Sequence, residues 1–270
     1  MSDTYDRSLA HWSEGGRREM EAFYAVASKD YRLLVEARDW SGLLSAMPAD
    51  DRRVLDVACG SGKFPQALTT YGSVEVGQEI QVDLLDPSPF SIEEAARALA
   101  PPFVRRDDLC MTLQALDPSR RYPVVWAVHG LYAIPAADLD LAIERFVGAI
   151  APGGVGFIAQ ARSEAHYLGF YERYLESRDG TPYTSVEQVE ASLRGLGVEL
   201  EIGSLRYDGV VPAGRPEVLE GYLQRCLFDD ALSLKDMLED EAMGPYLRRC
   251  RQADGSYAFP QVVSMLFLRP

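Results

Sequence analysis

The stretch Arg53-Val-Leu-Asp-Val-Ala-Cys-Gly-Ser-Gly-Lys-Phe64 decides the fold of this 270-residue chain. Residues 54–57 are strand-like and apolar apart from Asp56, a turn of small residues follows, and a helical pattern begins at Phe64. A strand, a glycine-rich turn and a helix in this order present backbone N–H groups at the end of a parallel sheet, where they can bind a nucleoside. The stretch therefore predicts a nucleoside-binding α/β protein.

Strand and helix patterns alternate around this turn. The run 124–128 is apolar throughout, which is typical of a central strand buried on both faces. In the second helix, Ser91 is the expected N-cap and Glu94 its capping-box partner. Strands separated by helices predict a doubly wound, mostly parallel, seven-stranded sheet. The predicted strands are 54–57, 81–85, 103–105, 124–128, 155–159, 198–202 (with an extension to 207) and 262–268, and the predicted helices are 64–71, 91–99, 138–150 and 185–193.

Composition and charge narrow the class of partner. The formal net charge is −14 and no run of Lys and Arg exceeds two residues, which argues against a nucleic-acid surface. The same acidity slightly favours a cationic or neutral substrate over an anionic one. No apolar stretch is long enough to span a bilayer, and the four cysteines are scattered, so we expect free thiols, a cytoplasmic location and no membrane partner.

The turn Asp56-Val-Ala-Cys-Gly-Ser-Gly62 resembles motif I of the class I methyltransferases, whose usual form is acidic-x-Gly-x-Gly-x-Gly. Ala58 takes the place of the first glycine. The resemblance implies that Asp56, Ala58, Gly60 and Gly62 bind S-adenosyl-L-methionine, which leaves as S-adenosyl-L-homocysteine. A glycine-rich turn alone is a weak signal, because nucleotide-binding Rossmann proteins share it.

Acidic residues after the next two strands strengthen the resemblance. Asp86 follows the strand 81–85, where the family binds both ribose hydroxyls, and Pro87 lies beside it. The alternative is that Asp86 only begins the Asp-Pro-Ser-Pro turn. Further along, the resemblance implies an adenine contact from Asp107 or Asp108, a choice that stays open, with Leu109 against the ring. Val128 completes the predicted cofactor site.

His129 is the predicted catalytic residue. In the family, the end of the fourth strand lies beside the transferred methyl group, and a histidine there can accept a proton or orient a nucleophile near neutral pH. The alternative is a histidine that is only hydrogen-bonded at a strand end. His11 and His166 are weaker candidates.

Aromatic residues after the fifth strand are candidates for the wall of an acceptor site. Tyr167, Phe170 and Tyr171 recur at helical spacing, which is also typical of core packing. Their rings could hold a flat heterocycle or a cation. Tyr24 and Tyr132 are further wall candidates beside His129.

Other segments resemble the small-molecule branch typified by histamine N-methyltransferase. They are Asp86-Pro-Ser-Pro-Phe-Ser-Ile92, His129-Gly-Leu-Tyr132 and Tyr183-Thr-Ser185. Bacterial natural-product methyltransferases that act on indole carbons are similar in outline. The resemblance implies methyl transfer to a nitrogen or a nucleophilic ring carbon of a small aromatic or amine natural-product intermediate. The alternatives are an O-methyltransferase, or a protein that binds the cofactor without transferring methyl.

Two helical regions flank the predicted sheet. Apolar residues in 19–27 and 31–37 recur every three or four positions, and a helical block at 216–247 separates the last two strands. We therefore expect a helical cap at 1–50, a cofactor-binding Rossmann-like domain of 51–211 with 258–270, and an insertion at 212–257. The insertion would serve as a lid or an oligomer contact, and the dense aromatics of the first 31 residues are compatible with a homodimer.

Three other classes of site have little support. The histidines and cysteines show no metal-ligand spacing, so no metal is expected. A serine hydrolase would need a Gly-x-Ser-x-Gly elbow. A nicotinamide dehydrogenase would need glycine where Pro65 stands.

Overall fold

The computed structural model describes residues 4–74 and 77–269, apart from the side chains of 17–19. At its centre is a seven-stranded sheet with the order β3-β2-β1-β4-β5-β7-β6, in which β7 runs antiparallel to both neighbours. The predicted doubly wound, mostly parallel sheet is confirmed. The strands are β1 (Arg53–Val57), β2 (Ile80–Leu85), β3 (Phe103–Leu109), β4 (Tyr122–Val128), β5 (Ile150–Ala161), β6 (Leu200–Val211) and β7 (Tyr257–Leu268).

Helices cover both faces of the sheet. Successive strand residues point to opposite faces. Val54 therefore packs under α4 (Lys63–Tyr71) and α5 (Pro89–Ala98), while Leu55 packs under α6 (Ala136–Gly148) and α8 (Val186–Gly195). Both residues are fully buried, as are Trp126 and Val125 on β4. The helices are α1 (Thr4–His11), α2 (Arg17–Glu36), α3 (Trp40–Ser45), α4 (Lys63–Tyr71), α5 (Pro89–Ala98), α6 (Ala136–Gly148), α7 (His166–Leu175), α8 (Val186–Gly195), α9 (Pro216–Leu227), α10 (Leu234–Glu239) and α11 (Met243–Cys250).

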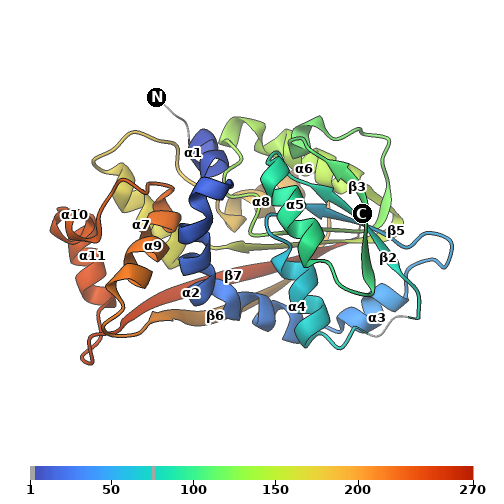
Figure 1. Cartoon of the computed structure of the whole chain (residues 1–270). Coiled ribbons are helices and arrows are strands. Elements are labelled where there is room, and N and C mark those ends of the chain that lie inside the picture. The colour runs from blue at the N-terminus through green and yellow to red at the C-terminus, as the bar shows by residue number, and fades with distance from the viewer. Residues whose placement is uncertain (1–3, 75–76, 270) are drawn as a thin grey trace.

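A helical cap stands at one end of the molecule. Figure 1 shows α7 and α9–α11 together at that end, α2 between them and the rest of the sheet, and the long strands β6 and β7 reaching beneath them. Helices α2 and α9 pack closely, because a Cβ on Gly221 would lie 2.8 Å from that of Ala22. The residues of this cap form their own hydrophobic core, separate from the two cores of the sheet.

The predicted strands are shorter than the observed ones, most clearly the third, fifth, sixth and seventh. The third strand does not stop at Arg105 but continues to Leu109, so Asp107 and Asp108 lie inside it. Strand β3 is at the edge of the sheet, where exposed charged side chains are tolerated and discourage further pairing. The sixth strand starts at Leu200 and runs past residue 207 to Val211, because it pairs with β7 over all twelve residues.

The predicted helices 91–99, 138–150 and 185–193 differ from the observed α5, α6 and α8 by one or two residues at each end. The N-cap of α5 is Ser88 and not Ser91, since Ser88 is extended, Pro89 fits the first helical position, and the Ser91 N–H donates to Ser88 Oγ at 3.1 Å. Helix α6 ends at Gly148, and Ile150 already belongs to β5. The glycines at 153 and 154, which were expected to precede that strand, lie within it.

Candidate active site

The turn after β1 has the backbone of a ligand-binding loop. Ala58, Gly60 and Gly62 have φ of 52°, 51° and 68°, in the left-handed region. A non-glycine residue there carries about 1–2 kcal/mol of strain, so Ala58 stores strain that the usual glycine would not. The Ala58 methyl group in turn restricts its neighbour, because a Cβ on Gly130 would lie 2.4 Å from it.

Two adjoining cavities open at the carboxyl ends of β1 and β4. Including the open space at their mouths, they enclose about 1100 Å³ and about 720 Å³. Ligands of doubly wound sheets bind at this edge, where the strand order reverses. The cavities share the lining residues Trp12, Ala58, Gly60, His129 and Tyr132.

Asp86 marks the smaller cavity. Its carboxylate follows β2 and accepts hydrogen bonds from Gly60 N at 3.1 Å and Ser88 N at 2.9 Å. Burial raises the pKa of Asp86 to about 6, against the opposing effect of these two N–H donors. Pro87 and Leu85 line the same cavity. A buried carboxylate at this position fits the two hydroxyls of a ribose.

Asp56 marks the larger cavity beside the same turn. It is buried, and its Oδ2 has no hydrogen-bond partner among the described residues. Burial, followed by the charge of Asp86, raises the pKa of Asp56 to about 8, while Trp126 acts in the opposite direction. An unsatisfied buried acceptor of this kind fits the ammonium group of an amino acid, which would favour the ionised carboxylate.

His129 pairs with a carboxylate from another part of the chain. Its Nε2 lies 2.5 Å from Oδ2 of Asp30, which is buried in α2. His129 also has a positive φ of 53°, and its backbone N–H donates to Ala159 O at 2.8 Å. The end of the strand therefore holds the residue in a strained conformation. Strained residues cluster at functional sites. The ring edge of Tyr31 faces the imidazole, with centroids 5.9 Å apart.

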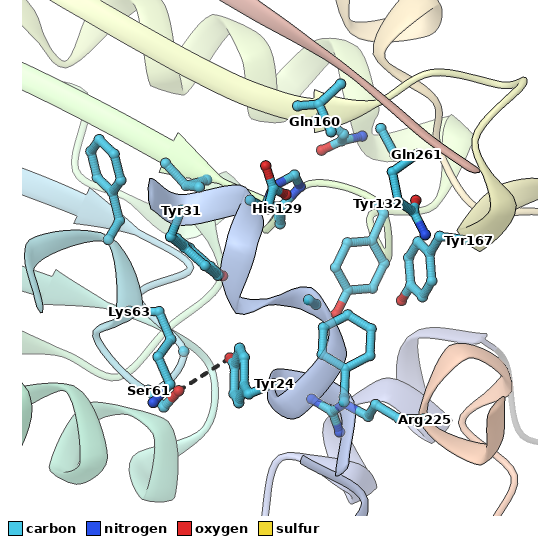
Figure 2. A pocket seen from close by; sticks show the side chains of 18 of the residues that line it. Tyr24, Tyr31, Ser61, Lys63, His129, Tyr132, Gln160, Tyr167, Arg225 and Gln261 are labelled. Carbon is cyan, nitrogen blue, oxygen red and sulfur yellow. Dashed lines mark hydrogen bonds and ion pairs between the residues drawn. The ribbon is translucent and has the colours of Figure 1, made fainter. Parts of the chain in front are cut away.

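Tyrosines make most of the wall around this pair. In Figure 2 the rings of Tyr24, Tyr31, Tyr132 and Tyr167 surround the space in front of His129. Tyr132 and Tyr167 meet edge to face at a centroid distance of 5.4 Å. Burial raises the pKa of Tyr24, Tyr31 and Tyr167, so these hydroxyls stay neutral at physiological pH.

The N-terminal segment closes over the cavities. Trp12 O accepts a hydrogen bond from Ser88 Oγ at 2.7 Å, and the indole covers the turn so closely that a Cβ on Gly60 would lie 3.1 Å from Trp12 Cη2. Helix α1 is anchored to α7, where Arg7 Nη1 donates to Tyr174 OH at 2.6 Å. The segment therefore bridges the cap and the turn after β1.

Most predicted cofactor residues meet at these cavities, but four do not line them. Gly62 lies under the turn against α5, where a Cβ would come within 2.9 Å of Ala95 Cα. Leu109 is buried in the core beneath the sheet. Asp108 pairs with Arg105, and Asp107 lies 3.5 Å from the guanidinium groups of both Arg106 and Arg120. The residues that line a cavity are Asp56, Ala58, Gly60, Asp86, Pro87 and Val128.

The predicted acceptor wall divides in the same way. Tyr24, His129, Tyr132 and Tyr167 line the larger cavity. Phe170 and Tyr171 do not, because they point into the core of the cap and are fully buried. Their helical spacing therefore reflects packing.

Neither of the two weaker histidine candidates lines a cavity. His11 is buried in α1 beside Phe228. His166 stacks among Phe170, Tyr222 and other rings, and burial lowers its pKa to about 3, so it is a neutral core residue.

Sequence reasoning missed three charged residues of the larger cavity: Lys63, at the start of α4, and Asp30 and Arg225, on helices of the cap. Asp30 and Arg225 each interrupt an apolar helix face, and this interruption is the signal that could have found them. Asp30 stands at helical spacing between Ala27 and Leu34, and Arg225 lies in a helix whose last seven residues are all buried. A charged residue in such a face needs a partner or a ligand.

Within the described ranges, no three His, Cys, Asp or Glu residues are placed to hold a metal ion. Among the described helices, none combines the length and the apolar character that a bilayer crossing requires.

Comparison with known proteins agrees with this geometry. Residues 54–154 match the family model described as "Methyltransferase domain". The "Ubiquinone biosynthesis O-methyltransferase" of Chelativorans sp. is 27% identical over 160 residues, which cover 58% of this chain and 60% of that protein. The similarity to this relative thus spans somewhat less than two thirds of its length.

Solved structures share the fold at low sequence identity. Magnesium protoporphyrin IX methyltransferase of Synechocystis PCC 6803, with bound SAH, has a TM-score of 0.56 at 12% identity, covering 98% of this chain and 99% of that one. A Thermotoga maritima protein described as "possible histamine N-methyltransferase" has a TM-score of 0.54 at 14% identity, covering 97% and 100%. These structures show that the chain has a Rossmann-like methyltransferase fold, and the family model matches a methyltransferase domain over residues 54–154.

Proposed function

We propose that the protein transfers a methyl group from S-adenosylmethionine to a hydroxyl of a small aromatic molecule, with His129 as the general base. The observation that carries this proposal is the pairing of His129 Nε2 with Asp30 Oδ2 at 2.5 Å inside a tyrosine-lined cavity. A hydroxyl is a poor nucleophile until a base removes its proton, whereas a neutral amine needs no base for the attack.

The residues of the turn would hold the cofactor. Asp86 is placed to accept hydrogen bonds from the ribose hydroxyls, and Asp56 Oδ2 is free to accept from the ammonium group. The cofactor supplies a methyl group that is already bonded to a good leaving group. The protein therefore has to align the acceptor with that methyl group and to exclude water.

His129 and Asp30 would act as a unit. The Asp30 carboxylate, 2.5 Å from Nε2, would stabilise the imidazolium that forms when the hydroxyl gives its proton to the other ring nitrogen. Burial of Asp30 and the neighbouring Tyr31 keeps this pair in place.

The helical segments would form the lid. We propose that residues 1–50 cap the site through Trp12 and α2, and that the insertion 212–257 completes the cap through α9. Closure over the methyl group would protect the aligned reactants from water.

A second candidate is transfer to a nitrogen or to a ring carbon, as expected from the sequence. The tyrosine wall favours it equally, since it would hold an indole or an aromatic amine as well as a phenol. The names of the curated relatives, which refer to O-methylation, support the hydroxyl.

The test is incubation with methyl-labelled S-adenosylmethionine and matched phenols, anilines and indoles, followed by mass spectrometry of the products. Label on phenolic oxygen is expected. Label only on nitrogen or carbon would contradict the hydroxyl, and SAH binding without any labelled product would favour a non-catalytic protein.

Asp86→Asn is the matched control for the cofactor. It should weaken SAH binding by about 10- to 100-fold, because charge-assisted hydrogen bonds are lost. In the wild type, SAH affinity should fall as the pH drops through about 6, where the buried carboxyl takes up a proton and loses an acceptor. The Asp86→Asn variant should lack that pH dependence.

A further inference from the structure

Arg225 is a buried cation that no carboxylate neutralises. It lies on α9, is 4% exposed, and lines the larger cavity. Its Nη1 has no hydrogen-bond partner, and among the ion pairs of the described residues none includes Arg225. Burying an unpaired charge is costly, and a ligand of opposite charge that enters the cavity would offset that cost.

The rings around Arg225 fix its position without supplying an acceptor. Its guanidinium carbon lies 4.3 Å from the ring centroid of Trp12 and 5.0 Å from that of Phe228. Cation–π contacts of this kind compensate part of the lost hydration and hold the planar group in one orientation. They leave the N–H donors of Nη1 available.

Residues other than Arg225 are better placed to bind the carboxylate of the cofactor. Ser61 and Lys63 belong to the turn and to the first position of α4, where the helix dipole favours an anion. Figure 2 shows both beside Tyr24, while Arg225 enters the cavity from the side opposite to His129, with Tyr132 drawn between them. Arg225 also does not line the smaller cavity, which is the one that Asp86 lines.

We propose that Arg225 binds a carboxylate of the acceptor, so that the acceptor is an aromatic hydroxy acid. This inference rests on the proposed function. The acid end pairs with Arg225, the ring lies among Tyr132 and Tyr167, and the hydroxyl at the other end reaches His129. A guanidinium can bind both oxygens of a carboxylate in a fixed plane, which orients the ring as well as holding it.

The charge of the cavity wall at Arg225 favours an anionic ligand, unlike the net charge of the whole chain. The net charge of −14 favours neutral or cationic ligands at the surface. Inside the cavity, however, Asp30 is already paired with His129, whereas Arg225 is unpaired. Arg225 therefore adds an uncompensated positive charge to the wall of the larger cavity.

The experiment is calorimetric titration of the SAH-loaded protein with three acids and the amide of each. The acids are 4-hydroxybenzoate, 4-hydroxyphenylacetate and 3-(4-hydroxyphenyl)propanoate, whose different lengths sample the span from Arg225 to His129. At least one acid should bind about tenfold or more tightly than its amide. In Arg225→Gln and Arg225→Met that preference should disappear, while the SAH affinity stays unchanged.

Arg225→Met is included in case Arg225→Gln does not fold. Replacing a buried charge by an apolar side chain of similar length often leaves stability unchanged or higher. Arg206→Gln, which removes an exposed arginine that pairs with Glu164, is the control and should keep the preference. Equal binding of acids and amides, or no binding of any acid, would overturn the proposal. Weaker SAH binding in both Arg225 variants would also overturn it, by assigning Arg225 to the cofactor.

Failure of the proposed function would look different. Acids that bind through Arg225 but are never methylated would support Arg225 as the carboxylate-binding residue and would contradict O-methyl transfer. Methylation of phenols that carry no acid, with unchanged rates in Arg225→Met, would keep the transfer and remove the anchor.

Discussion

His129 and His166 both lie near the carboxyl end of a central strand, yet their surroundings are opposite. His129 faces a cavity, and its Nε2 lies 2.5 Å from a buried carboxylate. His166 is enclosed by aromatic rings, with Nδ1 at 2.8 Å from Tyr246 OH. Enclosure by rings keeps His166 neutral, whereas His129 has a charged partner and remains accessible to a ligand from the cavity.

The largest effect is expected at His129. His129→Asn should reduce kcat by about 10²- to 10⁴-fold, the usual contribution of a general base, with the SAH affinity nearly unchanged. Asparagine is the preferred replacement because φ is 53° at this position and asparagine tolerates the left-handed region better than alanine. Rapid-quench turnover and calorimetry would check this, and an unchanged kcat would make the two histidines equivalent.

Asp30 should have the next largest effect. Asp30→Asn is expected to lower kcat by about 10- to 100-fold, since the imidazolium loses the carboxylate that stabilises it. Added to His129→Asn, it should cost little more, because a residue that acts through another gives non-additive losses. Strictly additive losses in the double variant would separate Asp30 from the base and assign it another role.

His166 should affect stability and not turnover. Its folded pKa of about 3 lies below the ordinary value of 6.5, so the unfolded chain takes up a proton first and stability falls as the pH drops from about 6.5 towards 3. This linkage amounts to about 2 kcal/mol at pH 5. In His166→Gln, the change in stability between pH 7 and pH 5, measured by urea unfolding, should lack this contribution of about 2 kcal/mol, while kcat at pH 7 stays near that of the wild type.

The smallest effect is expected at Ala58, which follows β1, the neighbour of β4 in the sheet. Ala58→Gly would relieve the left-handed strain and loosen the unfolded chain at the same time, so the net gain should be below about 1 kcal/mol. Thermal unfolding should show a rise of no more than about 3 °C, with unchanged SAH affinity. A loss of stability would show that the Ala58 methyl group makes packing contacts that outweigh the strain.

The sequence predicted the sheet well because local patterns determine it. Apolar runs such as 124–128, and the turn that follows Val57, require only their own residues to be recognised. The edge strand was cut short at Arg105 for the opposite reason. Asp108 and Leu109 belong to the strand because they pair with β2. Charged residues are not typical of a strand, so the sequence alone does not predict this part of β3.

Half of the site could be predicted in the same way. The residues at strand ends, such as Asp86 and His129, follow from topology, since the carboxyl ends of parallel strands meet at one edge. Asp30 and Arg225 come from helices whose position depends on how the cap folds back, about 100 residues from His129 in each case. No local pattern contains that information, although the charge within an apolar face marks both residues.

The contact between Ala58 and Gly130 has a consequence for how this protein can vary. The space between the two strand ends holds one methyl group, because a second Cβ would lie only 2.4 Å away. The pair can therefore be Ala–Gly, Gly–Ala or Gly–Gly, but not Ala–Ala. Any lineage that moves the methyl group from position 58 to position 130 must first lose it, so homologous chains should show these two positions changing together, with glycine at both as the intermediate.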